Sequence, residues 1–154
     1  MIRRATKSDM AALIGLLYQA DMVHHHLRPD LFKGDTSKYS EAELATILDD
    51  ESKPIFVYDF DGQVLGHAFC QISEVRDHRL LHDIKTLYID DICVEEAFRC
   101  SRIGTALFDF VRRYAESLGC YNITLNVWEG NDSAERFYRQ CGLRVQKTGM
   151  ELIL

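Results

Sequence analysis

The stretch 87–119, LYIDDICVEEAFRCSRIGTALFDFVRRYAESLG, decides the fold, because it predicts a strand, a turn and a helix in succession. Residues 87–94 are apolar on both faces apart from Asp90 and Asp91, which is typical of a central strand in a sheet. Alternation along a strand predicts that these two carboxylates point to opposite faces. Over 103–118 apolar residues recur every three or four positions, which predicts a helix with one buried face.

The joint between this strand and this helix is a candidate anion-binding site. The first N–H groups of a helix have no intrahelical partners and carry partial positive charge, so they attract anions. Arg99 and Arg102 add charge at this end, and Gly104 leaves room for a phosphate to approach the backbone. An ordinary strand–helix joint with solvated arginines explains the same residues. The glycine patterns of a P-loop and of a dinucleotide-binding turn are absent.

The rest of the chain predicts further strands and helices around this segment. Capping residues and apolar spacing predict helices that begin at Thr6, Ser40 and Asn131, whereas 21–38 reads as irregular. The remaining strands are expected at 2–5, 55–60, 64–72, 121–127, 143–147 and 150–154, with an Asp61-Gly62 hairpin turn after the second. This order predicts an α/β fold in the broad sense (α+β, with a mixed sheet), in three layers with helices on both faces of the central sheet.

Composition narrows the class of protein. The 154 residues are 47% hydrophobic and 27% charged, which predicts one globular domain over 1–154. A net charge of −6 argues against nucleic acid as a partner and is compatible with a cationic substrate, although mild acidity also serves solubility. Five cysteines without a C-x-x-C pair predict free thiols and a cytoplasmic location. No apolar stretch is long enough to predict a membrane span.

Several motifs, in order along the chain, resemble the GNAT superfamily of N-acetyltransferases. The matching segments are 88–94 (YIDDICV), 99–107 (RCSRIGTAL), 126–131 (NVWEGN), 134–138 (AERFY) and Gly142-Leu143. The resemblance implies a GNAT-like fold and the transfer of acetyl from acetyl-CoA to a primary amine of a small molecule or peptide. The turn departs from the family pattern at Arg102, where the family has a glycine. A non-catalytic acyl-CoA sensor or regulatory module, and a structural interaction domain, are the alternatives.

The resemblance also implies which residues bind the co-substrate, and it implies no metal. The pyrophosphate of CoA would rest on the turn formed by Arg99, Cys100, Ser101, Arg102, Ile103, Gly104 and Thr105. The pantetheine arm would pair with backbone groups of Ile92, Cys93 and Val94, as an added strand does. Asn131 matches a position that contacts this arm, and it is equally suited to capping the helix that follows.

Two side chains are candidate catalytic residues. Tyr138 matches the family tyrosine that protonates the departing thiolate. Because it also lies on an apolar helical face, the alternative is that it is an aromatic residue of the core. Asp90 matches an acidic position that serves relatives as a base or a substrate anchor, and a hydrogen-bonded structural role is the alternative.

The region of 21–38 is expected over the acceptor cleft, where Asp21, His24, Arg28 and Asp30 are candidate substrate contacts. The run His24-His25-His26 lacks the spacing and companion ligands of a metal site. A homodimer is possible, because dimers are common among family members and the segment 150–154 offers a sheet edge.

Overall fold

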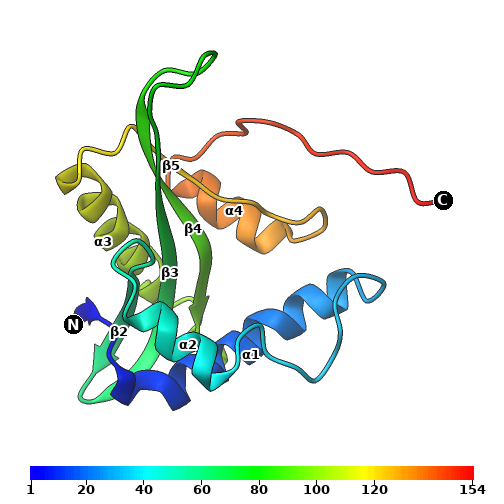
Figure 1. Ribbon diagram of the computed structural model, residues 1–154. Coiled ribbons are helices and arrows are strands. Elements are labelled where there is room, and N and C mark those ends of the chain that lie inside the picture. The colour runs from blue at the N-terminus through cyan, green and yellow to red at the C-terminus, as the bar shows by residue number, and fades with distance from the viewer.

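The computed structural model describes all residues 1–154, which form a five-stranded sheet with helices packed against it (Figure 1). In chain order the elements are β1 (Ile2–Arg4), α1 (Met10–Leu27), α2 (Glu41–Leu48), β2 (Ile55–Phe60), β3 (Gln63–Val75), β4 (Ile84–Val94), α3 (Ile103–Ser117), β5 (Asn122–Thr124) and α4 (Asp132–Gln140), with short 3-10 turns at Lys7–Asp9 and Glu96–Phe98. The strand order is β1-β2-β3-β4-β5, antiparallel except for the parallel pair β4–β5. The predicted mixed sheet and α/β fold are confirmed.

Two apolar cores hold the helices to the sheet. One gathers α3 with the facing side chains of β2, β3 and β4, including Phe56, Leu87 and Leu107. The other joins α1 and α2 to the opposite face through residues such as Leu17 and Leu44. Helices therefore cover both faces, as the sequence predicted. No helix combines the length and the apolar character that a membrane-crossing segment needs.

Gly66 in β3 allows α3 to approach the sheet closely. A Cβ atom at this position would lie 2.9 Å from the Cys93 carbonyl oxygen and 3.2 Å from a methyl carbon of Leu107. Because the carbonyl belongs to the backbone of β4, it has no freedom to move aside. The absence of a side chain at this one position therefore helps to fix the contact between β4 and α3.

Helix α1 is longer than the sequence predicted. It continues to Leu27, so the histidines of 24–26 lie in its last turns and the expectation of irregular structure there is wrong. The last turns are held by tertiary contacts, which outweigh weak local propensity. His25 Nδ1 lies 2.7 Å from the Phe32 carbonyl oxygen, and the ring of His24 is 5.3 Å from that of Phe32.

The predicted strands at 143–147 and 150–154 are absent, and β5 is shorter than the expected 121–127. The chain turns at Gly142, where φ is +95°, and then runs outward in extended form without pairing to any strand of the same chain (Figure 1). Every residue of 144–154 is exposed. We call 144–154 the C-terminal arm. Strand-like sequence did not produce a strand because a ladder also requires a partner edge.

Candidate functional site

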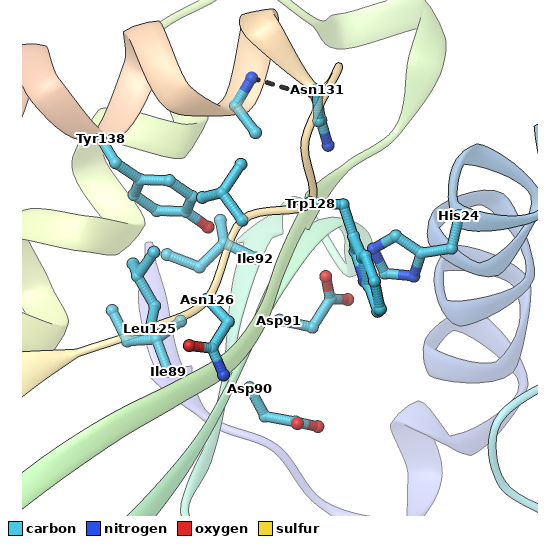
Figure 2. Close-up of a pocket in the computed structure, with 12 residues that line it drawn as sticks. His24, Ile89, Asp90, Asp91, Ile92, Leu125, Asn126, Trp128, Asn131 and Tyr138 are labelled. Carbon is cyan, nitrogen blue, oxygen red and sulfur yellow. Dashed lines mark hydrogen bonds between the residues drawn. The ribbon is translucent and has the colours of Figure 1, made fainter. Parts of the chain in front are cut away.

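A cleft opens where β4 and the chain beyond β5 separate. The parallel ladder pairs Thr86 with Asn122 and continues to Tyr88 with Thr124, where it ends. Immediately beyond this last pair the two segments line opposite walls of a pocket, and α1 and α4 supply the remaining walls (Figure 2). The lining residues are His24, Ile89, Asp90, Asp91, Ile92, Leu125, Asn126, Val127, Trp128, Asn131, Ala134 and Tyr138.

An irregularity in β4 brings both carboxylates to this cleft. Opposite β3, Phe69 pairs with Asp91 and Cys70 pairs with Ile89, so Asp90 is the extra residue of a β-bulge. The bulge interrupts alternation, and Asp90 and Asp91 both line the pocket (Figure 2). The expectation that they point to opposite faces is therefore wrong, because simple alternation assumes an unbroken ladder.

Asp91 is held by a buried histidine that the sequence analysis missed. Its Oδ2 atom lies 2.6 Å from Nε2 of His67, a residue of β3 that is 0% exposed. The other ring nitrogen, Nδ1, is buried without a hydrogen-bond partner. The only sequence signal was a polar ring inside the apolar strand segment 64–70, VLGHAFC. In the sheet His67 pairs with Cys93, two residues from Asp91, so His67 and Asp91 are diagonal neighbours on one face.

Asp90 has a different partner, the side chain of Lys38. Its Oδ2 atom accepts a hydrogen bond from Lys38 Nζ at 2.6 Å, and its side chain is 27% exposed against 17% for Asp91. The backbone N–H of Lys38 also donates to Asp21 Oδ2 at 2.7 Å. Burial raises the pKa of Asp21, and the charge of Asp91 adds to this effect. Three carboxylates are therefore gathered at this side of the cleft.

Tyr138 projects from α4 into the cleft, with its hydroxyl directed toward the space between the strands (Figure 2). Burial raises the pKa of this phenol well above its usual value, and the negative charge of Asp91 raises it further. The hydroxyl is therefore protonated at neutral pH and can act as a proton donor. Its ring also meets that of Phe137 edge-on at 5.0 Å, so it has a packing role as well.

The wall formed by 126–131 combines an aromatic ring with a helix cap. Asn131 accepts a hydrogen bond from the Ala134 N–H at 3.2 Å, which confirms its capping geometry, and it also lines the cleft. Trp128 lies between His24 and Asn131 in Figure 2. The Arg28 guanidinium lies 5.8 Å from the centre of the Trp128 ring. Arg28 also forms ion pairs with Asp30 and Glu151.

Arg102 in the predicted phosphate turn has the left-handed backbone conformation that favours glycine. Cys100 and Arg102 both have φ of 65°, and Arg102 is the N-cap of α3 in the left-handed region. The first backbone N–H with an acceptor inside the helix is that of Ala106, which donates to the Arg102 carbonyl at 3.0 Å. The N–H groups of 103–105 precede it and have no intrahelical partner. Arg102, which replaces the glycine of the family pattern, therefore still adopts the left-handed conformation that glycine favours.

The other predicted cofactor residues surround this turn. Ile92 lines the cleft, Cys93 is buried and Val94 ends β4. Arg99 Nε donates to the Val94 carbonyl at 3.4 Å, and the Ser101 hydroxyl donates to the Phe98 carbonyl. A Cβ atom on Gly104 would lie 3.4 Å from the ring of Phe137, which is van der Waals contact, so α3 and α4 lie close together at this position. Burial raises the pKa of Cys93 to about 12, which disfavours a thiolate nucleophile there.

Comparison with known proteins defines the class. The sequence profile of the Acetyltransferase (GNAT) family matches residues 20–143, most of the chain, so the protein belongs to this family. A crystallised mutant of the BH1408 protein from Bacillus halodurans is 28% identical, with a TM-score of 0.95 over 100% of this chain and 99% of its own. The resemblance to the GNAT superfamily is confirmed.

Two curated relatives match in part. An uncharacterized N-acetyltransferase of Methanocaldococcus jannaschii is 24% identical over 141 residues, which is 92% of this chain and 59% of the relative. Glucosamine 6-phosphate N-acetyltransferase of Arabidopsis thaliana is 30% identical over 59 residues, 38% of each chain. This chain spans about half the length of the curated relatives that it matches.

The left-handed conformation of Arg102 predicts a measurable effect on stability. A side chain with a Cβ atom is disfavoured there, so Arg102→Gly should raise the free energy of unfolding by about 0.5–1 kcal/mol, after the extra chain entropy of glycine is deducted. Arg102→Ala is the matched control, because it removes the same charge and keeps the strain. Urea unfolding of the three proteins tests this. Equal stability of the glycine and alanine variants would contradict it.

Proposed function

We propose that this protein is an N-acetyltransferase that transfers acetyl from acetyl-CoA to a primary amine, by direct attack in a ternary complex. The observation that carries the proposal is the separation of β4 from the chain beyond β5, directly beside the unpaired N–H groups at the start of α3. A thioester with a long amide-bearing arm and a diphosphate needs these two features together: free strand edges for the arm and main-chain donors for the anion.

In the proposed complex, acetyl-CoA is bound by backbone groups more than by side chains. Consecutive left-handed and helical residues form a concave set of N–H groups that suits an anion. Cys100 and Arg102 supply this conformation, and the arginines at 99 and 102 add positive charge. At the end of β4, residues 92–94 pair with β3 on one side and have no strand partner on the side of β5, so that edge is available to a ligand that pairs as a strand does. We therefore assign the diphosphate to 99–105 and the pantetheine arm to 92–94, with Asn131 beside it.

The acceptor side of the cleft favours an amine of net positive charge. The carboxylates of Asp21, Asp90 and Asp91 lie close enough for their negative charges to interact. The ring of Trp128 adds an aromatic face to the same cleft. Carboxylates attract an ammonium group, whereas they repel a phosphorylated acceptor. For this reason we place the acceptor among cationic small molecules or peptides rather than sugar phosphates, although one curated relative is named for glucosamine 6-phosphate.

Proton transfer needs a base for the ammonium and an acid for the leaving sulfur. Asp91 is the better-placed base, since its carboxylate lies toward Tyr138 in the cleft and Asp90 lies farther from that phenol (Figure 2). Asp90, paired with Lys38 at the more exposed edge, is suited to anchoring the cation. After the amine nitrogen has bonded to the acetyl carbon and the carbon–sulfur bond has broken, Tyr138 donates its proton to the thiolate, and the second proton that the nitrogen loses as the amide forms restores the phenol. His67 positions Asp91 through its hydrogen bond.

The proposal is tested by calorimetry with acetyl-CoA, followed by a thiol-release assay with a panel of polyamines, amino acids, aminoglycosides and peptides. We expect binding, and thiol release that depends on the amine and is strongest for polycations. Binding without release for any amine would favour the alternative of a non-catalytic acyl-CoA sensor. A purified, folded protein with no affinity for acetyl-CoA would exclude both functions.

Tyr138→Phe tests the acid. The substitution keeps the ring and its contact with Phe137, so the fold and the affinity for acetyl-CoA should change little. General acid–base groups typically contribute a factor of about 100 to 10,000, and we expect kcat to fall by at least the lower of these. Steady-state kinetics with the best acceptor provides the measurement. An unchanged kcat would remove Tyr138 from the mechanism.

Asp91→Asn and Asp90→Asn form a matched pair that separates base from anchor. The Asp91 variant should lose about 100-fold or more in kcat, with the largest loss at low pH where the free amine is scarce. The Asp90 variant should mainly raise the KM for the amine, because it removes an attraction without removing the proton acceptor. Full pH profiles of kcat and KM decide the assignment. The reverse pattern would make Asp90 the base.

A further inference from the structure

We propose that Lys38 is a specificity-determining residue, because its ammonium group occupies the position at Asp90 in which an acceptor with two positive charges places its second ammonium. This role presupposes the proposed function and adds to it a competitor that belongs to the chain itself. Lys38 Nζ donates a hydrogen bond to Asp90 Oδ2 at 2.6 Å, and Asp90 lines the cleft. An acceptor with one ammonium leaves this pair in place, whereas a diamine has to displace Lys38.

The lining of the cleft has no cation of its own to neutralise its aspartates. The 12 lining residues include Asp90 and Asp91 but no lysine or arginine. Asp91 is bonded to His67, and Lys38 is the one lysine or arginine that pairs with either aspartate. The ammonium of Lys38 also lies 5.4 Å from the centre of the Tyr39 ring. A carboxylate and an aromatic face together form a favourable environment for a primary ammonium, whether it comes from the chain or from an acceptor.

The backbone around Lys38 is held in place, so that its side chain can leave without a change of fold. The segment 28–40 joins α1 to α2 and contains no helix or strand (Figure 1). The Lys38 N–H donates to Asp21 Oδ2 at 2.7 Å, and the ring of Tyr39 stacks on that of Phe69 with centroids 6.1 Å apart. These contacts attach the segment to α1 and β3. Since the lysine stem is long and flexible, rotation of this side chain is enough to free Asp90.

The ammonium of Lys38 is charged, and its pair with Asp90 is open to exchange. Burial by itself lowers the pKa of Lys38, but the hydrogen bond and the charge of Asp90 raise this pKa above its usual value. The side chain of Lys38 is 41% exposed and that of Asp90 is 27% exposed, so water reaches both partners. Ion pairs of this exposure contribute little, because water solvates the separated charges well. A second ammonium brought by an acceptor can therefore replace that of Lys38.

The bulge in β4 places the two carboxylates at a separation that a short diamine can span. Asp90 and Asp91 are consecutive residues, so their Cα atoms are about 3.8 Å apart, and both side chains line one cleft (Figure 2). The reacting amine belongs beside Asp91, the proposed base. An ammonium a few carbons further along the same molecule then meets Asp90. Lys38 therefore limits the preference of the cleft for dications.

Calorimetry in the presence of CoA tests whether Lys38 competes with a diamine. The ligands are 1,4-diaminobutane and n-butylamine, and the variants are Lys38→Met, Lys38→Arg and the control Lys33→Met. Lys33 belongs to the same segment and is exposed. In Lys38→Met the Kd of the diamine should fall at least about threefold more than that of the monoamine, which matches the loss of a modest ion pair. Lys38→Arg keeps the competing charge, so it and the control should retain the native ratio of the two Kd values.

Thiol release with the same two amines measures the corresponding ratio of kcat/KM. Three results overturn the proposal: no binding of the diamine, a ratio that Lys38→Met leaves unchanged, or an equal change in the Lys33→Met control. Lys38→Gln repeats the measurement if circular dichroism shows that methionine disturbs the fold. Absence of thiol release with every amine contradicts the proposed function instead. Because the ratio of Kd values needs no turnover, the two failures are distinguishable.

Discussion

The loss of hydrogen bonding between two parallel strands is the constraint on which the rest of the structure depends. The ladder between β4 and β5 ends after Tyr88 and Thr124, and backbone groups beyond it have no partner within the sheet. Unpaired backbone inside a fold must find water or a ligand. The bulge at Asp90 occurs just past this point and turns two carboxylates into the gap. The cleft, its acidic wall and its access to Tyr138 therefore follow from one interruption of the sheet.

Sequence reasoning recovered the elements whose signal is local. The apolar spacing of 103–118 and the Asp61-Gly62 turn predicted α3 and the β2–β3 hairpin, and both are present. The helix expected to begin at Ser40 is present as α2, and Ser40 caps it together with Glu43. Among the site residues that the family motifs predicted, Asp90, Ile92, Asn131 and Tyr138 line the cleft, and their roles there stay predictions. Each of these depends on neighbours within a few positions or on a short ordered motif.

The features that sequence reasoning missed depend on contacts far apart in the chain. A bulge in β4 is defined against β3, so the shared orientation of Asp90 and Asp91 could not be deduced from β4 alone. The role of His67 is evident only from its hydrogen bond with Asp91, which lies 24 positions away in the sequence. The extension of α1 depends on contacts with Phe32. The strands expected at 143–147 and 150–154 did not form for a related reason. A strand requires a partner edge, and this part of the chain runs away from the sheet.

The distribution of cysteines has a practical consequence for spectroscopy. Burial raises the pKa of the thiols of Cys70 and Cys93 to about 12, and it also raises those of Cys120 and Cys141. Cys100 is exposed, and it sits in the turn before α3. Since alkylating reagents attack accessible thiolates, a maleimide dye at neutral pH should modify Cys100 first. The native chain thus accepts a fluorophore in the turn before α3 without any engineered residue.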